Sequence, residues 1–210
     1  MNNEFFETKI NSKFDKRITN NDFIDKLDLR QSNCEKVWSL NKSCFNPDLI
    51  KNANTIIVGT LTPPNGMENG YYYSSNKNHI FSIIDKCLNT NGKFLSLKKQ
   101  LLLNPKSKVQ ISQIENALFE YKLAFIDVIN KAVRIKNSPN DNDILFFSLD
   151  YFSFEKCAPY QKFICTSQNA ENCLLRITEN KNVKINKDNI FVCYQDRFHF
   201  NINDWQQKLK

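Results

Sequence analysis

The stretch N-T-I-I-V-G at residues 54–59 decides the fold that we expect for this chain. A short β-branched apolar run that ends in Gly is typical of a strand buried on both faces. Similar apolar runs predict three further strands, at 123–128, 162–167 and 189–193. Apolar residues at helical spacing occupy segments between and after these strands, at 80–88, 93–103, 110–121, 169–180 and 202–209. The alternation predicts an α/β fold, a three-layer sandwich with a central, mostly parallel four-stranded sheet flanked by helices.

The chain length of 210 residues allows one medium domain or one domain with an extension. Hydrophobic residues make up 41% and charged residues 24%, which excludes disorder throughout. No apolar run approaches the roughly 20 residues that a membrane helix needs, and the N-terminus lacks a secretory signal pattern. We therefore expect a cytoplasmic, monomeric protein with no membrane partner. We divide it into an N-terminal helical extension at 1–43 and an α/β domain at 44–210.

The charge balance and the cysteines restrict the partners and cofactors. The 29 basic and 22 acidic side chains leave a net charge of +7, which suits a polyanion such as nucleic acid. The many Asn residues beside Lys and Ile are also typical of an AT-rich genome, which would raise the Lys content without any binding role. Seven Cys with no C-x-x-C pair, and only two His, predict structural thiols and neither a metal site nor a cofactor.

The loops after the strands are the places where we expect chemistry, because ligands of parallel sheets bind beyond the carboxyl ends. These loops are 59–81, 127–143, 166–170 and 194–200. In the first loop, three consecutive tyrosines at 71–73 predict that at least one ring faces a ligand such as a nucleobase, or else that they form a partly buried cluster. Asn78 stands at an expected helix start, where its amide caps the helix or orients a substrate or water.

These segments together resemble the uracil-DNA glycosylase superfamily, in the branch of the hypoxanthine-type glycosylases. The first motif is carried by G-T at 59–60, a Pro-containing loop, G-Y-Y-Y at 70–73, Asn78 and Phe81. Further similar segments follow the family order, namely C-F-N-P at 44–47, F-I-D-V-I at 125–129, Arg134, D-N-D-I at 141–144, F-I-C-T-S at 163–167, N-A at 169–170 and Trp205. The resemblance spans residues 44–209 and leaves the first forty residues unexplained.

The resemblance implies a metal-independent DNA glycosylase. Such an enzyme flips a damaged or modified base, of uracil or hypoxanthine type, out of single- or double-stranded DNA and hydrolyses its N-glycosidic bond to leave an abasic site. The implied catalytic residues are Asn78, Asp127 and His199. The implied base-binding residues are Gly59, Thr60, Tyr72, Tyr73, Phe81, Thr166 and Ser167, and the implied DNA-binding residues are Arg134, Arg197 and Phe198. Asp127 has an alternative role as a loop cap at the end of a buried strand.

The last strand departs from the family pattern. The family usually continues it with a Pro-Ser-Pro or His-Pro-Ser loop, whereas this chain has Y-Q-D-R-F-H-F at 194–200. There His199 is placed to donate to an oxyanion, Arg197 to contact phosphate and Phe198 to act as a wedge, or else they are ordinary surface residues. This departure motivates two alternatives, a non-catalytic nucleic-acid-binding module on the same fold and a protein-interaction module whose basic charge has only a genomic cause.

Overall fold

The parallel sheet expected from the apolar runs is the centre of the molecule. The computed structural model describes residues 14–30, 32–195 and 200–209. Four strands pair in the order β3-β2-β6-β7. Their bounds are Thr55–Gly59 for β2, Leu123–Asp127 for β3, Lys162–Cys165 for β6 and Ile190–Val192 for β7. All three pairings are parallel, and Gly59 lies opposite Asp127 at the carboxyl ends of β2 and β3.

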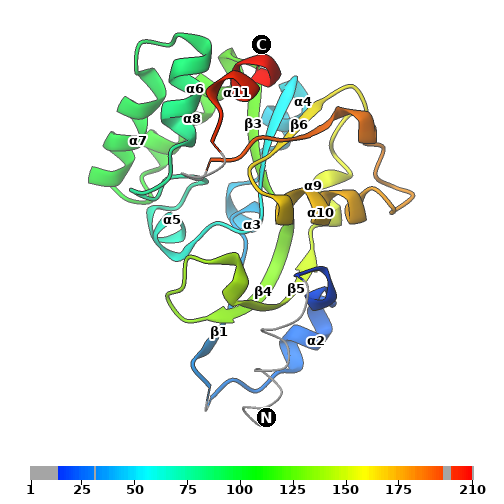
Figure 1. Cartoon of the computed structure of the whole chain (residues 1–210). Helices are drawn as coiled ribbons and strands as arrows, with labels where there is room; N and C mark the ends of the chain where they lie inside the picture. The colour runs from blue at the N-terminus through cyan, green and yellow to red at the C-terminus, as the bar shows by residue number, and fades with distance from the viewer. Residues whose placement is uncertain (1–13, 31, 196–199, 210) are drawn as a thin grey trace.

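Helices cover both faces of this sheet (Figure 1), so the expected α/β sandwich is confirmed. One side carries α6 (Ile80–Leu88), α7 (Lys93–Leu103) and α8 (Lys108–Glu120), and the other side carries α10 (Gln168–Ile177). The last helix, α11 (Ile202–Leu209), packs on α6. Within the described ranges, no helix combines the length and the apolar character that a membrane crossing requires.

The shorter elements connect the strands and surround their ends. They are η1 (Phe14–Arg17), α2 (Asn21–Lys26), α3 (Asn41–Cys44), α4 (Pro47–Asn52), α5 (Pro64–Asn69), η2 (Asp141–Asp143), α9 (Tyr151–Phe154) and η3 (Lys187–Asn189). Several begin with the side-chain cap that their sequences provide. Asn46, for example, accepts hydrogen bonds from the first backbone N–H groups of α4.

A second sheet of three antiparallel strands was not expected from the sequence. It consists of β1 (Cys34–Trp38), β4 (Ile129–Ile135) and β5 (Ile144–Leu149), in the order β1-β4-β5. The expectation of a loop across 127–143 is therefore wrong for β4, and the helical reading of 1–43 missed β1. The charged residues Lys131 and Arg134 make the β4 sequence look like a polar segment, although both side chains are buried.

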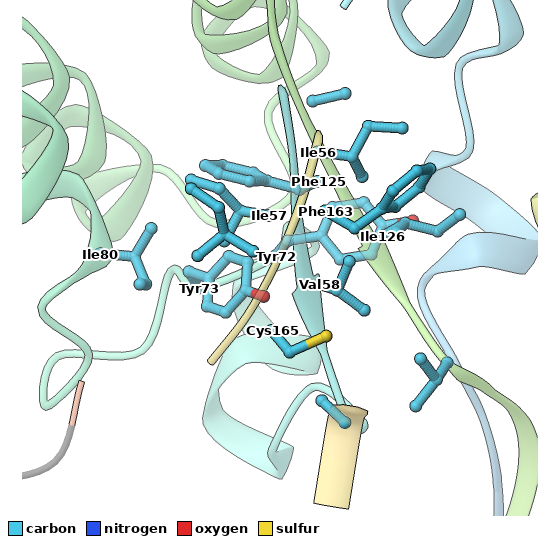
Figure 2. Close-up of a cluster of buried hydrophobic side chains, with 14 of the residues drawn as sticks. Ile56, Ile57, Val58, Tyr72, Tyr73, Ile80, Phe125, Ile126, Phe163 and Cys165 are labelled. Atoms are coloured by element: carbon cyan, nitrogen blue, oxygen red, sulfur yellow. The ribbon is translucent and has the colours of Figure 1, made fainter. Parts of the chain in front are cut away.

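The hydrophobic core forms around the parallel strands, as Figure 2 shows for β2, β3 and β6. Ile56, Ile57 and Val58 have no solvent exposure. Phe125 of β3 is the centre of an aromatic cluster. The centroid of its ring lies 5.0 Å from the Tyr73 ring centroid and 5.7 Å from the Phe81 ring centroid. Each fully buried side chain of this size contributes about 1.5–3 kcal/mol, so this cluster fixes the loop after β2 against the sheet.

Candidate active site

A cavity of about 260 Å³ lies at the carboxyl ends of β2, β3 and β6, where the sheet topology predicts a ligand site. Segments that are far apart in the sequence supply its wall. The wall includes Gly59, Thr60, Thr62, Tyr73, Asn78, Asp127, Asp141, Thr166, Ser167 and Gln195. Most lining side chains carry polar groups, including the ammonium of Lys77, and Leu61, Pro63 and Pro139 add apolar surface to the wall.

Asp127 is the buried carboxyl group of this cavity, with 2% of its surface exposed. Its Oδ2 accepts hydrogen bonds from the backbone N–H and from the hydroxyl of Thr62, both at 2.8 Å. Burial raises the pKa of Asp127 to about 6, against the opposing effect of the two Thr62 hydrogen bonds. The carboxylate therefore changes its protonation state close to neutral pH, which is the range that a general base requires.

The backbone of Gly59 lets Asp127 and Tyr73 approach the same point. A Cβ atom at position 59 would lie 2.6 Å from Asp127 Oδ1 and 2.9 Å from Tyr73 Oη. Tyr73 Oη is buried and has no hydrogen-bond partner among the described residues. The neighbouring Thr166 hydroxyl lies close enough to lower the pKa of Tyr73 slightly, but it donates its own hydrogen bond to the carbonyl of Val58. Burial dominates and raises the pKa of Tyr73 well above 10, so the phenol stays a proton donor.

Asn78 also lines the cavity, two residues before α6, and is half-buried. Its Oδ1 accepts the backbone N–H of Ile80 at 2.9 Å, and its carbonyl accepts Lys98 Nζ at 2.6 Å. Among the described residues, nothing accepts a hydrogen bond from Asn78 Nδ2. Asn78 thus lines the cavity and also satisfies the first backbone N–H of α6, while the N-cap position itself is His79, which makes no side-chain cap.

The hydroxyl groups at the end of β6 are already engaged. Ser167 Oγ accepts the backbone N–H of Ala170 at the start of α10, and it lies 3.1 Å from Thr60 Oγ1. Asp141 completes this side of the wall and accepts a hydrogen bond from Asn169. Burial raises the pKa of Asp141 as well. The resemblance placed Asp141 in a matching segment but did not assign it to the site.

The fold resembles that of a candidate uracil DNA glycosylase. That protein comes from Methanosarcina acetivorans, and its structure was determined in solution by NMR. The TM-score is 0.52 at 15% sequence identity, and the match covers 76% of this chain and 90% of the other. No protein-family model and no curated protein sequence matches the chain. At this identity the likeness shows a shared fold.

Two of the expected base-binding residues belong to the core. Tyr72 is 1% exposed and donates its hydroxyl to Asn41 Oδ1 at 2.7 Å, and Phe81 has no exposed surface. Packing against Phe125 holds both rings beneath the cavity (Tyr72 is visible in Figure 2). The expectation that Tyr72 and Phe81 contact the base is therefore corrected, and Tyr73 is the tyrosine of the three that lines the cavity.

The expected DNA contact of Arg134 is also corrected. This side chain is 1% exposed, lies in β4 and donates to the carbonyl of Ser138. Asp141 and Asp143 are near enough to stabilise its charge, so Arg134 belongs to the interior of the second sheet. His199, Arg197 and Phe198 lie outside the described residues.

Asn41 is a residue of this region that the sequence did not indicate. Its side-chain amide makes two hydrogen bonds to the backbone of Asp127. Oδ1 accepts the Asp127 N–H at 3.0 Å, and Nδ2 donates to the Asp127 carbonyl at 2.6 Å. Nδ2 also donates to Asp150 Oδ2 at 2.5 Å. No local pattern distinguishes Asn41 in a chain so rich in Asn, since the partners of its side chain, Tyr72 included, lie between 31 and 109 residues away.

Proposed function

We propose that this chain is a DNA glycosylase that hydrolyses the N-glycosidic bond of a damaged or modified base, of uracil or hypoxanthine type, in single- or double-stranded DNA. The observation that carries the proposal is the position of Asn78 and Asp127 in the wall of one polar cavity at the strand ends. The fold shared with a candidate uracil DNA glycosylase supports it. We propose that the protein acts as a monomer and without a cofactor.

The size of the cavity supports a single extrahelical base as the ligand. Its volume of about 260 Å³ is just below the ~300–1,000 Å³ typical of sites for drug-sized ligands. Enzymes that act on a base in DNA take it out of the stack into such a pocket. Tyr73 offers an aromatic edge and a phenol donor to the base, and Gln195 adds an amide.

Asp127 and Asn78 have complementary roles in the proposed reaction. Asp127 Oδ2 is held by Thr62, so Oδ1 is the oxygen that takes the proton from water as the water oxygen bonds to C1′ of the sugar. The C1′–N bond breaks, and its electron pair leaves with the base. The Asn78 amide positions the water, since a neutral amide cannot itself take the proton.

Tyr73 is a neutral donor for the stabilisation of the departing base, and Lys77, which lines the same cavity, adds a cationic one. The base carries negative charge as it leaves, and a preorganised donor in a buried site stabilises such charge strongly. Tyr73 is suited to this because burial keeps its phenol protonated. Good leaving groups should therefore be cleaved best.

Formation of abasic sites tests this proposal. Oligonucleotides that carry uracil, hypoxanthine or a modified pyrimidine are incubated with the full chain in the presence of EDTA and then treated with alkali. We expect strand breaks at the modified base with at least one substrate, and loss of these breaks in Asn78→Ala. A wild-type protein that is folded and inert on the whole panel contradicts the proposal.

A second candidate is a nucleic-acid-binding module without catalysis. It is favoured by the buried positions of Tyr72 and Phe81, which remove two of the base contacts that the resemblance implies. This module would bind the same oligonucleotides in a salt-sensitive way and leave them resistant to alkali. A binding titration run beside the cleavage assay separates the two functions.

A further inference from the structure

A second, larger cavity opens around α3 and α9 and shares no lining residue with the candidate active site. Its volume is about 540 Å³. Its wall includes the aromatic residues Trp38, Phe45, Tyr151 and Phe152 together with Lys42, and we name it the aromatic cleft. Trp38 is 39% exposed, Tyr151 37% and Phe152 65%. Large aromatic side chains gathered on one surface of a protein mark an interaction site more often than scattered ones do.

Cations accompany these rings. Lys42 Nζ lies 3.9 Å from the centroid of the Trp38 ring, and Lys156 Nζ lies 5.0 Å from that of Phe152. Both lysines are exposed, and in the described part of the chain neither is in a salt bridge with a carboxylate. The one carboxyl group that lines the cleft, Asp150, is 5% exposed and accepts hydrogen bonds from Asn41 and Ser153. The accessible charge of the cleft is therefore positive.

We propose that the aromatic cleft binds single-stranded nucleic acid, with unpaired bases stacked on Trp38, Tyr151 and Phe152. Exposed rings beside cations are the combination that binds single strands, because every base has a π-face and every nucleotide a phosphate. The buried Lys131 ammonium also lies over the Trp38 ring, 4.4 Å from its centroid, and is held there by Asp25. A base that stacks on Trp38 therefore displaces only the exposed Lys42 ammonium, which then pairs with a neighbouring phosphate. A duplex is excluded, since the faces of its bases are covered by stacking. The proposal goes beyond glycosylase chemistry and does not depend on it.

Tryptophan fluorescence reports on this cleft directly. The chain has two Trp residues, and Trp205 has no exposed surface, so Trp38 is the one that a ligand can contact. We titrate the protein with an octamer of deoxythymidine, which contains no damaged base. We expect saturable quenching. A matched octamer of abasic nucleotides carries the same phosphates and should quench far less.

Two aromatic variants with equal exposure localise the binding. Phe152 and Tyr160 are each 65% exposed, but Tyr160 does not line the cleft. Loss of one stacking ring weakens single-strand binding about tenfold. We expect that loss in Phe152→Ala and an unchanged dissociation constant in Tyr160→Ala. Because both side chains are largely in solvent, neither substitution should unfold the protein, and circular dichroism checks this.

Two lysine variants test the pairing of the cleft with phosphate. Removing one lysine–phosphate pair reduces the slope of log affinity against log salt by about 0.7 for a single strand. Lys42→Gln should reduce the slope by about that amount, whereas Lys99→Gln on the exposed face of α7 should leave it unchanged.

Several results would overturn the proposal. They are an absence of quenching at low ionic strength, equal quenching by the abasic octamer, equal quenching by an octamer of glutamate, and equal losses in Phe152→Ala and Tyr160→Ala. The outcome does not depend on the proposed function, because cleavage of modified oligonucleotides is measured separately. Cleavage without binding at the cleft would contradict only the proposal for the aromatic cleft. Binding at the cleft without cleavage would contradict only the proposed glycosylase activity.

Discussion

At the carboxyl end of β3, burial and a pair of Thr62 hydrogen bonds act on Asp127 in opposite directions, and burial prevails. The pKa of about 6 means that the carboxylate is fully available as a base only above that pH. We therefore predict that cleavage rises with pH up to about pH 6–7 and then levels off. A pH profile of kcat/KM measures this. An acid limb near pH 4, the range of an ordinary aspartate, would remove Asp127 from the role of base.

The same pKa predicts a dependence of stability on pH. The folded state holds the Asp127 proton more tightly than the unfolded chain does, so this residue reduces stability as pH rises from about 4 to about 6. We expect that Asp127→Asn, whose amide oxygen can still accept from Thr62, abolishes cleavage but raises the free energy of unfolding at pH 7 by up to about 3 kcal/mol. Near pH 4 the two proteins should be equally stable. Urea unfolding at both pH values tests the prediction.

Asn78 separates a capping effect from a catalytic one. Asn78→Ala removes the cap at Ile80, which costs about 0.5–2 kcal/mol, and removes the group that positions water, which should lower cleavage about 100-fold or more. Asn78→Asp is the matched control for folding because a carboxylate retains the cap. Single-turnover cleavage together with thermal unfolding distinguishes the effects. If activity falls no more than the fraction of folded protein does, Asn78 has a capping role and no catalytic role.

At the scale of elements, Asn41 connects α3 to the end of β3 and, through Asp150, to α9. Asn41→Ala leaves buried groups of Asp127, Tyr72 and Asp150 unpaired, and we expect a loss of about 2–4 kcal/mol in stability. We also expect the acid limb of the pH profile to shift, since the backbone of Asp127 is released. Tyr72→Phe removes one donor to Asn41 and is the matched control, with a loss of about 1 kcal/mol and an unchanged profile. An unchanged profile in Asn41→Ala would make Asn41 a structural residue only.

The parallel strands could be predicted from the sequence because each is short, apolar and bounded by polar residues. The strand Ile129–Ile135 could not, because Lys131 and Arg134 break its apolar pattern and find their partners only in the folded chain. Lys131 pairs with Asp25, and Arg134 with the Ser138 carbonyl. A buried charged residue with a partner cannot be told from an exposed one in a sequence, which is why β4 was missed.

The sequence also indicated some residues of the candidate site and missed others. Asn78, at the start of a predicted helix, and Asp127, near the end of a predicted strand, could be placed at the edge where ligands bind. Which tyrosine reaches the cavity depends on how three rings pack around Phe125, and the sequence carries no periodicity that decides it. Asn41 depends on contacts across the whole chain, so no local signal could reveal it.

At the scale of the whole molecule, the net charge of +7 has two explanations that salt can separate. If the lysines neutralise phosphates, the affinity for an oligonucleotide should fall at least tenfold between 50 and 200 mM NaCl, as for proteins with several phosphate contacts. Fluorescence anisotropy with an undamaged oligonucleotide measures this. If the affinity does not change with salt, the high Lys content is explained by genome composition and not by phosphate binding.

The hydrogen atom of Gly59 has a practical consequence for engineering this pocket. Since any larger substituent meets Asp127 Oδ1 and Tyr73 Oη at once, a library aimed at new substrates has to keep position 59 constant. Gln195, which lines the same wall from the segment after β7 and is only half-buried, is the position to randomise. Substitutions at position 195 can change the shape of the cavity without disturbing the Asp127 carboxyl group.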